Sequence, residues 1–304
     1  MASRRFKLAS MEEALGQMRA GMSLLIGGMQ WHNRPSALVR AIVRQGIGEL
    51  VLYSTPQAAW DVDLLVGAGL VTRTYCPYVG FEYMGMAPNY RAAAESGKID
   101  AVICEAATLV AGIKATIEGI PYHPIGSLIG TQIVEASPLL RRYTGPFGDE
   151  LVAVKALKPE VGIFHAQEAD EYGNIRHLGS AFMDNYVAKA SGVVIATVDR
   201  IISHDEVLRE PHRTTVPGFL VDMVVEVPYG AHPCASHSLY NYDEGHLLEY
   251  LGAARASASG QNPVAFADYL EKYVYGPASQ PEYLARVGGV ERMAALVEEA
   301  RIDV

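Results

Sequence analysis

The chain has 304 residues, of which 50% are hydrophobic and 19% are charged, and its formal net charge is −9. This composition is typical of a globular protein. Nucleic-acid binding needs clustered Lys and Arg to neutralise phosphates, and the sequence contains no long basic run. No proline-, serine- or charge-rich linker divides the chain, so we expect one domain over residues 1–304, with covering helices from about residue 240.

The three cysteines, Cys76, Cys104 and Cys234, are far apart and form no C-x-x-C pair. This spacing argues against a disulfide framework or a metal site and fits a reducing compartment. The apolar run near the basic N-terminus is too short for a signal peptide, and no stretch of about 18 apolar residues exists. We therefore expect a cytoplasmic protein with no membrane span and no metal.

Short runs rich in Val, Ile, Leu and Tyr alternate with helical patterns along the chain. Most of these runs are apolar at consecutive positions, which is typical of strands buried on both faces. We expect strands at residues 23–26, 50–53, 71–75, 101–104, 152–154, 161–165, 193–197 and 221–227.

Helices are expected between these strands. One begins near Pro35 and ends at Gly46, and another, with apolar residues every fourth position from Leu109, ends at Gly119. Residues 124–148 are punctuated by glycine and proline and are expected to form connecting loops. The alternation predicts an α/β fold, with a largely parallel sheet covered by helices on both faces. The covering helices are expected at residues 247–251, 266–274 and 290–300.

The first candidate site is the turn Gly27-Gly28, which ends the first expected strand and precedes a helix. Ligands of parallel sheets bind beyond the carboxyl ends of the strands, where exposed N–H groups can hold an oxyanion. The turn matches neither a dinucleotide-binding fingerprint nor a P-loop. The alternative is that packing alone requires the two glycines.

Glu105 is the second candidate, because it follows an expected strand and precedes a helix. A carboxylate at this position can serve as a general base facing a crevice. It can equally be a residue that begins the helix and is stabilised at its N-terminus.

Two further segments contain histidines. Residues 165–174, His-Ala-Gln-Glu-Ala-Asp-Glu-Tyr-Gly-Asn, follow an expected strand and end in a turn signal. His165 could act as an acid, a base or a hydrogen-bond donor, although a polar residue of this kind is more often structural. His232 lies in a loop that two prolines constrain. The histidines have no metal-ligand spacing, and no hydrolase nucleophile motif is present.

Taken together and in this order, these segments resemble the α subunit of family I CoA-transferases, especially the glutaconate CoA-transferase branch. The resemblance covers about residues 21–250, and its most specific stretch is residues 156–174. Residues 217–222 and 228–233 support it. The chain departs from the family signature at Met29, where Phe is common, and at Asn33, where Gly is common.

The resemblance implies an open three-layer α/β/α sandwich with a mainly parallel mixed sheet. It also implies a β subunit, commonly in an α2β2 assembly, whose glutamate forms the covalent intermediates while CoA moves from an acyl-CoA to a carboxylic acid. Coenzyme A would then be a substrate, and no permanently bound cofactor is expected. On this chain, Gly27, Gly28 and Ser127 would line the acyl pocket, with Glu105 as the catalytic candidate.

Two alternatives remain. Some relatives of this branch resemble steroid ring-opening hydrolases that act on CoA thioesters, in which Glu105 would be the base. That branch carries an Arg where this chain has Gly126, which favours the transferase. The second alternative is a non-catalytic ligand-binding or assembly subunit.

Overall fold

Runs of consecutive apolar residues form the central strands of a mainly parallel sheet in the computed structural model, which describes residues 5–301. Seven of its described strands follow the order β11-β10-β8-β1-β2-β3-β4 with parallel neighbours, and β9 pairs antiparallel with β8. The strands are β1 (Ser23–Ile26), β2 (Leu50–Ser54), β3 (Val71–Tyr75), β4 (Asp100–Ala101), β8 (Val161–Ala169), β9 (Ile175–Arg176), β10 (Val193–Ile201) and β11 (Met223–Glu226).

Helices cover both faces of this sheet, so the predicted three-layer sandwich is confirmed. Alternation along β1 shows the two faces, because Leu24 and Ile26 join one hydrophobic core and Leu25 joins the other. The first core includes residues of α2 (Ser36–Gln45), α3 (Trp60–Gly67), α9 (Glu244–Ala258) and α10 (Ala265–Leu270). The second includes residues of α5 (Ala106–Ile117) and α7 (Asp184–Ala190).

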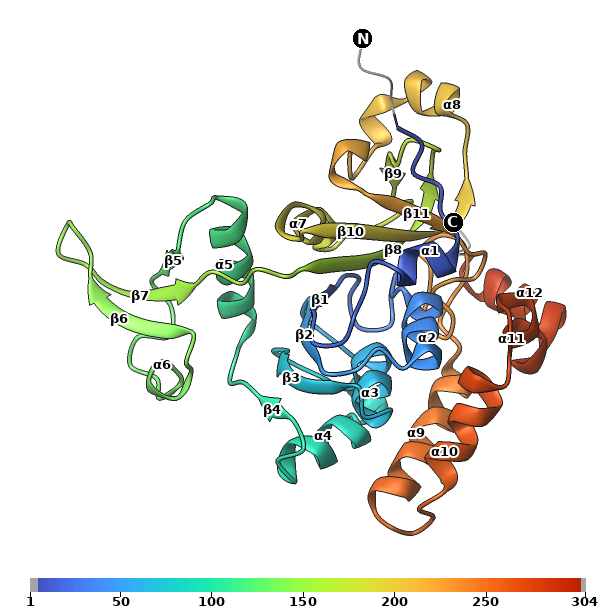
Figure 1. Cartoon of the computed structure of the whole chain (residues 1–304), viewed down its shortest axis with the longest axis horizontal. Coiled ribbons are helices and arrows are strands. Elements are labelled where there is room, and N and C mark those ends of the chain that lie inside the picture. Colours follow the sequence, from blue (N-terminus) through green and yellow to red (C-terminus); the bar gives the residue numbers. More distant parts are fainter. Residues whose placement is uncertain (1–4, 302–304) are drawn as a thin grey trace.

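The helices after residue 243 pack beside α2 and α3, at the lower right of Figure 1. Tyr250 and Leu251 of α9 are fully buried in the core that α2 and α3 share. None of the described helices is long and apolar enough to span a membrane. The remaining helical elements are α1 (Met11–Leu15), α4 (Pro88–Glu95), α6 (Ile133–Ala136), α8 (His204–Arg209), α11 (Gln280–Arg286), α12 (Gly289–Glu299), a π-helical turn (Glu271–Tyr275) and short 3-10 turns (Glu82–Met84, Pro211–Arg213, Gly218–Leu220).

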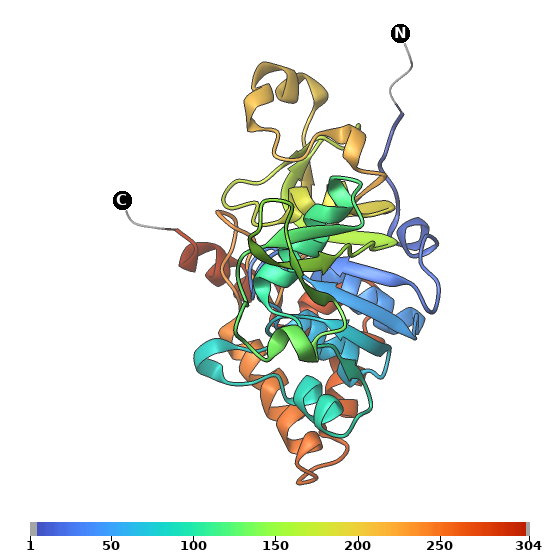
Figure 2. The same cartoon turned by 90° about the vertical axis from the view of Figure 1, so that its left-hand side faces the viewer.

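A second sheet forms an arm that extends away from the main sheet, as Figures 1 and 2 show. Its antiparallel strands, in the order β5-β7-β6, are β5 (Tyr122–Ile125), β6 (Leu140–Thr144) and β7 (Glu150–Lys155). The prediction of connecting loops over residues 124–148 is therefore wrong for most of β5, for α6 and for β6. The cause is that β5 and β6 each obtain their hydrogen-bond partners from β7, farther along the chain.

Two strand boundaries also differ from the prediction. The strand expected at 101–104 is β4 (Asp100–Ala101), which pairs only with β3 and ends before Cys104. β8 continues to Ala169 because β1 and β10 pair along its two sides and β9 pairs with its end. His165 therefore lies in the middle of a strand and not at its end.

The order of strands reverses between β1 and β8. From β1 the chain proceeds through β2 and β3 toward β4, whereas from β8 it proceeds through β10 toward β11. The helix after β1, α2, packs into one core, and α7, after β8 and β9, packs into the other. Such a switch point is where open α/β sheets bind ligands beyond the carboxyl ends of their strands.

Candidate active site at the sheet switch point

The turn Gly27-Gly28 lies at this switch point, directly after β1. Gly28 has φ +76°, a left-handed conformation that favours glycine. A Cβ atom on Gly27 would lie 2.3 Å from Asp184 Oδ1 and 2.7 Å from Phe164 Cβ. Glycine is therefore required at position 27 by the close approach of α7 and β8, and at position 28 by the backbone conformation.

The N–H groups of the two glycines already have acceptors within the chain. Gly27 donates to the Ile163 carbonyl at 2.8 Å, and Gly28 donates to Asp184 Oδ1 at 2.8 Å. Asp184 is fully buried, and its other oxygen lies 3.0 Å from His177 Nε2. In this conformation the glycines shape the turn, while their N–H groups are committed to the protein.

A buried arginine fixes the other side of the turn. Arg34 Nη1 donates to the Gly27 carbonyl at 2.8 Å, and Nε donates to the Gln30 carbonyl at 3.1 Å. Its guanidinium also forms an ion pair with Asp61 at 3.2 Å, and both side chains are fully buried. Because the pair is desolvated and hydrogen-bonded, it holds residues 27–34 in one shape.

Buried amide and hydroxyl groups connect this loop to β8 and to residues 235–237. Gln167 Nε2 donates to Asn33 Oδ1 at 2.9 Å and to Ser236 Oγ at 2.8 Å. Asn33 has φ +53°, and its Oδ1 also accepts from the His237 N–H at 3.1 Å. Asn33, where the family commonly has Gly, therefore occupies the left-handed region and bonds both neighbouring segments.

His32 and His237 lie close together at the edge of this network. Their ring centroids are 4.9 Å apart, and His32 Nδ1 is buried with no hydrogen-bond partner among the described residues. Both residues line a pocket of about 330 Å³. Burial, the nearby His237 and Arg34 lower the pKa of His32 to about 4, so the ring is neutral at neutral pH and can donate or accept one hydrogen bond.

Sequence reasoning did not single out His32. The available signal was its position, because it stands four residues after Gly28 in the loop that follows β1. A neutral imidazole with an unused nitrogen beside a pocket can hydrogen-bond a ligand carbonyl or transfer a proton. Among the predicted site residues, only Gly27 and Gly28 lie in this same loop.

Glu105 performs the helix-start role. It is the N-cap of α5, and its carboxylate accepts from the N–H groups of Ala107 at 2.9 Å and Thr108 at 2.8 Å. The residue is partly exposed. These contacts satisfy two of the orphan donors of the helix, and the exposed part of the carboxylate remains open to solvent.

Ser127 lies far from the glycine turn along the fold, in the loop that follows β5 of the arm. Its side chain is exposed. The described structure of this chain thus does not place Ser127 in a cavity with Gly27 and Gly28. Any pocket that includes Ser127 needs a second surface.

The predicted histidines are structural in their contacts. His165 is fully buried, with Nδ1 2.9 Å from Thr197 Oγ1 and Nε2 3.0 Å from Asp199 Oδ2. His232 is also fully buried, between Tyr283 at 2.7 Å and Asp243 at 3.2 Å. Because both ring nitrogens of each residue are engaged, neither histidine faces a ligand.

Asp170 closes the turn at the end of the 165–174 segment. It accepts hydrogen bonds from the N–H groups of Tyr172 and Asn174, from Asn174 Nδ2 at 2.7 Å, and lies 2.7 Å from His204 Nδ1. Burial would raise the pKa of Asp170, but these hydrogen bonds outweigh it and hold the pKa below its ordinary value. No cluster of three metal-ligating side chains occurs in residues 5–301.

Comparison with protein families identifies the chain. The family model for coenzyme A transferase matches residues 8–227. The chain belongs to the coenzyme A transferase family. It is 28% identical to the α subunit of glutaconate CoA-transferase of Acidaminococcus fermentans, over 93% of this chain and 92% of that protein. It is 29% identical to the cholesterol ring-cleaving hydrolase IpdA subunit of Rhodococcus jostii, over 94% and 97%.

A further relative of this CoA-transferase family chain is an uncharacterised protein of Archaeoglobus fulgidus, 34% identical over 97% of this chain and 66% of that protein. The chain thus spans slightly less than two thirds of that relative.

Solved structures agree with the family assignment. Glutaconate coenzyme A-transferase from A. fermentans superposes with a TM-score of 0.89, at 27% identity and over 95% of each chain. The decarboxylase AibA/AibB superposes with a TM-score of 0.76, at 28% identity, over 87% of this chain and 98% of that chain. Proteins of this shape therefore include more than one reaction class.

Proposed function

We propose that this chain is the α subunit of a heteromeric CoA-transferase, which moves CoA between an acyl-CoA and a carboxylic acid. The observation that carries the proposal is the agreement with glutaconate CoA-transferase over 95% of both chains at a TM-score of 0.89. The position of Gly27 and Gly28 at the sheet switch point supports it, because ligands of such sheets bind there.

The covalent chemistry is proposed to reside on a β subunit, as in an α2β2 assembly. A glutamate of that partner attacks the acyl-CoA carbonyl and releases the CoA thiolate, which leaves an acyl-glutamyl anhydride. The thiolate attacks the glutamyl carbonyl, gives a glutamyl–CoA thioester and releases the first carboxylate. A second carboxylate then reverses these steps and leaves with CoA. CoA is a substrate throughout, and the mechanism needs no resident cofactor.

This chain would supply walls of the acyl pocket. Gly27 and Gly28 allow a ligand to approach the backbone at the switch point, with the neutral ring of His32 in the same loop. Ser127, exposed on the arm, could join that pocket only where the partner chain closes it. We propose Gly27, Gly28 and Ser127 as substrate-binding residues on this basis.

A second candidate is a ring-opening hydrolase of CoA thioesters with Glu105 as the base. The similarity to the ring-cleaving IpdA subunits favours it, at the same level of identity as the similarity to the transferase. Two observations favour the transferase. Gly126 stands where we place an Arg in the ring-opening branch, and both Glu105 oxygens accept hydrogen bonds from α5.

The substitution Glu105→Gln separates the two candidates in the complex with the β subunit. A hydrolase that loses its general base should slow by about 10²–10⁴-fold. A transferase with its own β-subunit glutamate should keep at least about a tenth of its activity, because Gln still offers one oxygen to the α5 N–H groups. The measurement is the rate of acyl-CoA consumption with and without an added carboxylate.

Glu118→Gln is the matched control, because Glu118 is at the other end of α5 and its carboxylate faces His123. It should leave the rate unchanged. Consumption without any carboxylate acceptor, abolished by Glu105→Gln alone, would contradict the transferase and support the hydrolase. A correctly assembled complex that consumes no thioester from a broad acyl-CoA panel would support a non-catalytic subunit.

A further inference from the structure

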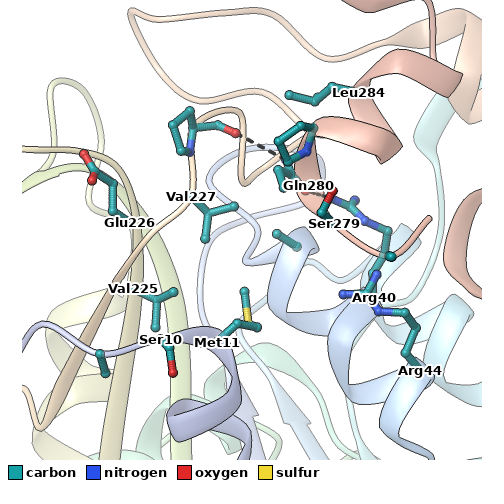
Figure 3. Close-up of a pocket in the computed structure, with 15 residues that line it drawn as sticks. Ser10, Met11, Arg40, Arg44, Val225, Glu226, Val227, Ser279, Gln280 and Leu284 are labelled. Atoms are coloured by element: carbon teal, nitrogen blue, oxygen red, sulfur yellow. Dashed lines mark hydrogen bonds between the residues drawn. The ribbon is translucent and has the colours of Figure 1, made fainter.

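A separate pocket of about 420 Å³ lies between α1, α2, the end of β11 and the start of α11, and Figure 3 shows its lining. Two arginines of α2, Arg40 and Arg44, face it together with Gln280. Apolar side chains complete the wall, among them Met11, Val227 and Leu284. Neither the glycine turn nor Glu105 belongs to this pocket.

Arg40 is a buried cation without an anionic partner among residues 5–301. Its side chain is 1% exposed, with Nη1 donating to the His232 carbonyl at 2.7 Å and Nη2 to Gln280 Oε1 at 2.8 Å. The guanidinium also lies over the Tyr283 ring, 3.5 Å from its centroid. These partners are neutral, so the charge itself is not compensated, and burial lowers the pKa of Arg40.

The other buried arginines differ in this respect. Arg34 forms an ion pair with Asp61 at 3.2 Å, and Arg176 lies 3.7 Å from Glu206. A buried charge normally requires such a partner, since desolvation without one is costly. The comparison makes Arg40 the exception among the buried arginines of the described chain.

Arg44 adds a second positive charge on the same face of α2, one helical turn later. It is partly buried, and its Nη1 reaches only the Val274 carbonyl, at 3.5 Å. Burial and the proximity of Arg40 lower its pKa, as expected for like charges at i and i+4. The carboxylate that lines the pocket is Glu226, which is exposed and accepts from the Ile201 N–H at 2.9 Å.

We propose that this pocket binds a small organic acid, with its carboxylate between Arg40 and Arg44 and its short apolar chain against Met11, Val227 and Leu284. The carboxylate supplies the counter-charge that the protein does not, and guanidinium groups bind carboxylates through paired N–H donors. The apolar wall favours a chain of a few carbons over a compact inorganic anion.

The test is isothermal titration calorimetry of the full-length chain with hexanoate, acetate and inorganic phosphate. Hexanoate should bind about tenfold or more tightly than acetate, because its additional methylenes become buried. Arg44→Gln should weaken hexanoate binding by about 10- to 100-fold, the usual value of a charge-assisted hydrogen bond. This substitution removes a like-charge repulsion, so the variant should fold, and thermal unfolding checks that it does.

Arg141→Gln is the control for a general loss of positive charge, since Arg141 is exposed on β6 of the arm. It should change hexanoate affinity by less than about twofold. Hexanoate binding that is equal in the native chain and in Arg44→Gln would place the acid elsewhere and overturn the proposal. The absence of hexanoate binding, or phosphate binding in its place, would overturn it as well.

Discussion

The loop after β1 and the arm of β5, β6 and β7 differ in how their candidate residues are held. Gly27 and Gly28 are buried, and contacts from β8, α7 and Arg34 fix their positions. Ser127 and Gly126 on the arm are exposed, and a Cβ on Gly126 would meet nothing within 4 Å. The chain thus builds one half of a site by itself and leaves the other half open to a second surface.

Asp184 gives the largest expected difference between the two regions. Replacing it with Ala leaves the Gly28 N–H and the His177 ring without their buried partner, which should cost about 3–5 kcal/mol of unfolding free energy. Asp149→Ala, at an exposed position of the arm, should change that value by less than about 0.5 kcal/mol. Urea unfolding of both variants measures the difference, and equal losses would show that the turn does not depend on Asp184.

Asp63 extends the comparison to pH. Burial raises its pKa from 3.8 to about 6, against hydrogen bonds from Tyr250, Tyr90 and Asn89. The folded chain therefore retains a proton that the unfolded chain releases, so this contribution to stability is complete below about pH 4 and is lost as pH rises through 6.

The neutral variant Asp63→Asn should then gain stability relative to the native chain between about pH 4 and 6, by roughly 3 kcal/mol. Asp149→Asn on the arm should show no such pH-dependent difference. The measurement is urea unfolding of the three proteins across this pH range. A constant difference between Asp63→Asn and the native chain would mean that Asp63 is ionised over the whole range.

Gly27→Ala tests the close packing of the turn directly. Its new Cβ would overlap Asp184 Oδ1 and Phe164, so we expect a loss of about 1–3 kcal/mol in unfolding free energy. The matched change Gly126→Ala should stay within about 0.5 kcal/mol. If Gly27→Ala is as stable as Gly126→Ala, the account of the turn as tightly packed is incorrect.

Ser127→Ala gives the smallest expected effect in the isolated chain, because the hydroxyl is exposed. Its unfolding free energy should change by less than about 0.5 kcal/mol. In the assembled complex the same change should raise the KM for acyl-CoA by severalfold if Ser127 lines the pocket. A KM equal to that of the native complex would remove Ser127 from the substrate-binding residues.

Local signals in the sequence predict much of the main sheet and its helices. Consecutive apolar residues predict β1 and β8, and Gly46, with φ +67°, ends α2 as its pattern indicates. Glu105 begins α5 because its position between a strand and a helix allows it to cap the helix. These features depend on residues within a few positions of one another.

The features that were missed depend on contacts between distant residues. Asp184 bonds Gly28 across 156 positions, and no local pattern marks that contact. The arm strands β5 and β6 become visible only once β7 pairs with both of them. His32 acquires its low pKa from burial and from His237, which is more than 200 positions away.

Intact-mass spectrometry of the complex with its β subunit, following incubation with acyl-CoA, tests the central claim most directly. The co-expressed product of the neighbouring open reading frame is the partner to use. The account predicts an acyl or CoA adduct on the partner chain, none on this chain, and its disappearance when a carboxylate is added. An adduct on this chain, or thioester consumed by water with no adduct on either chain, would contradict it.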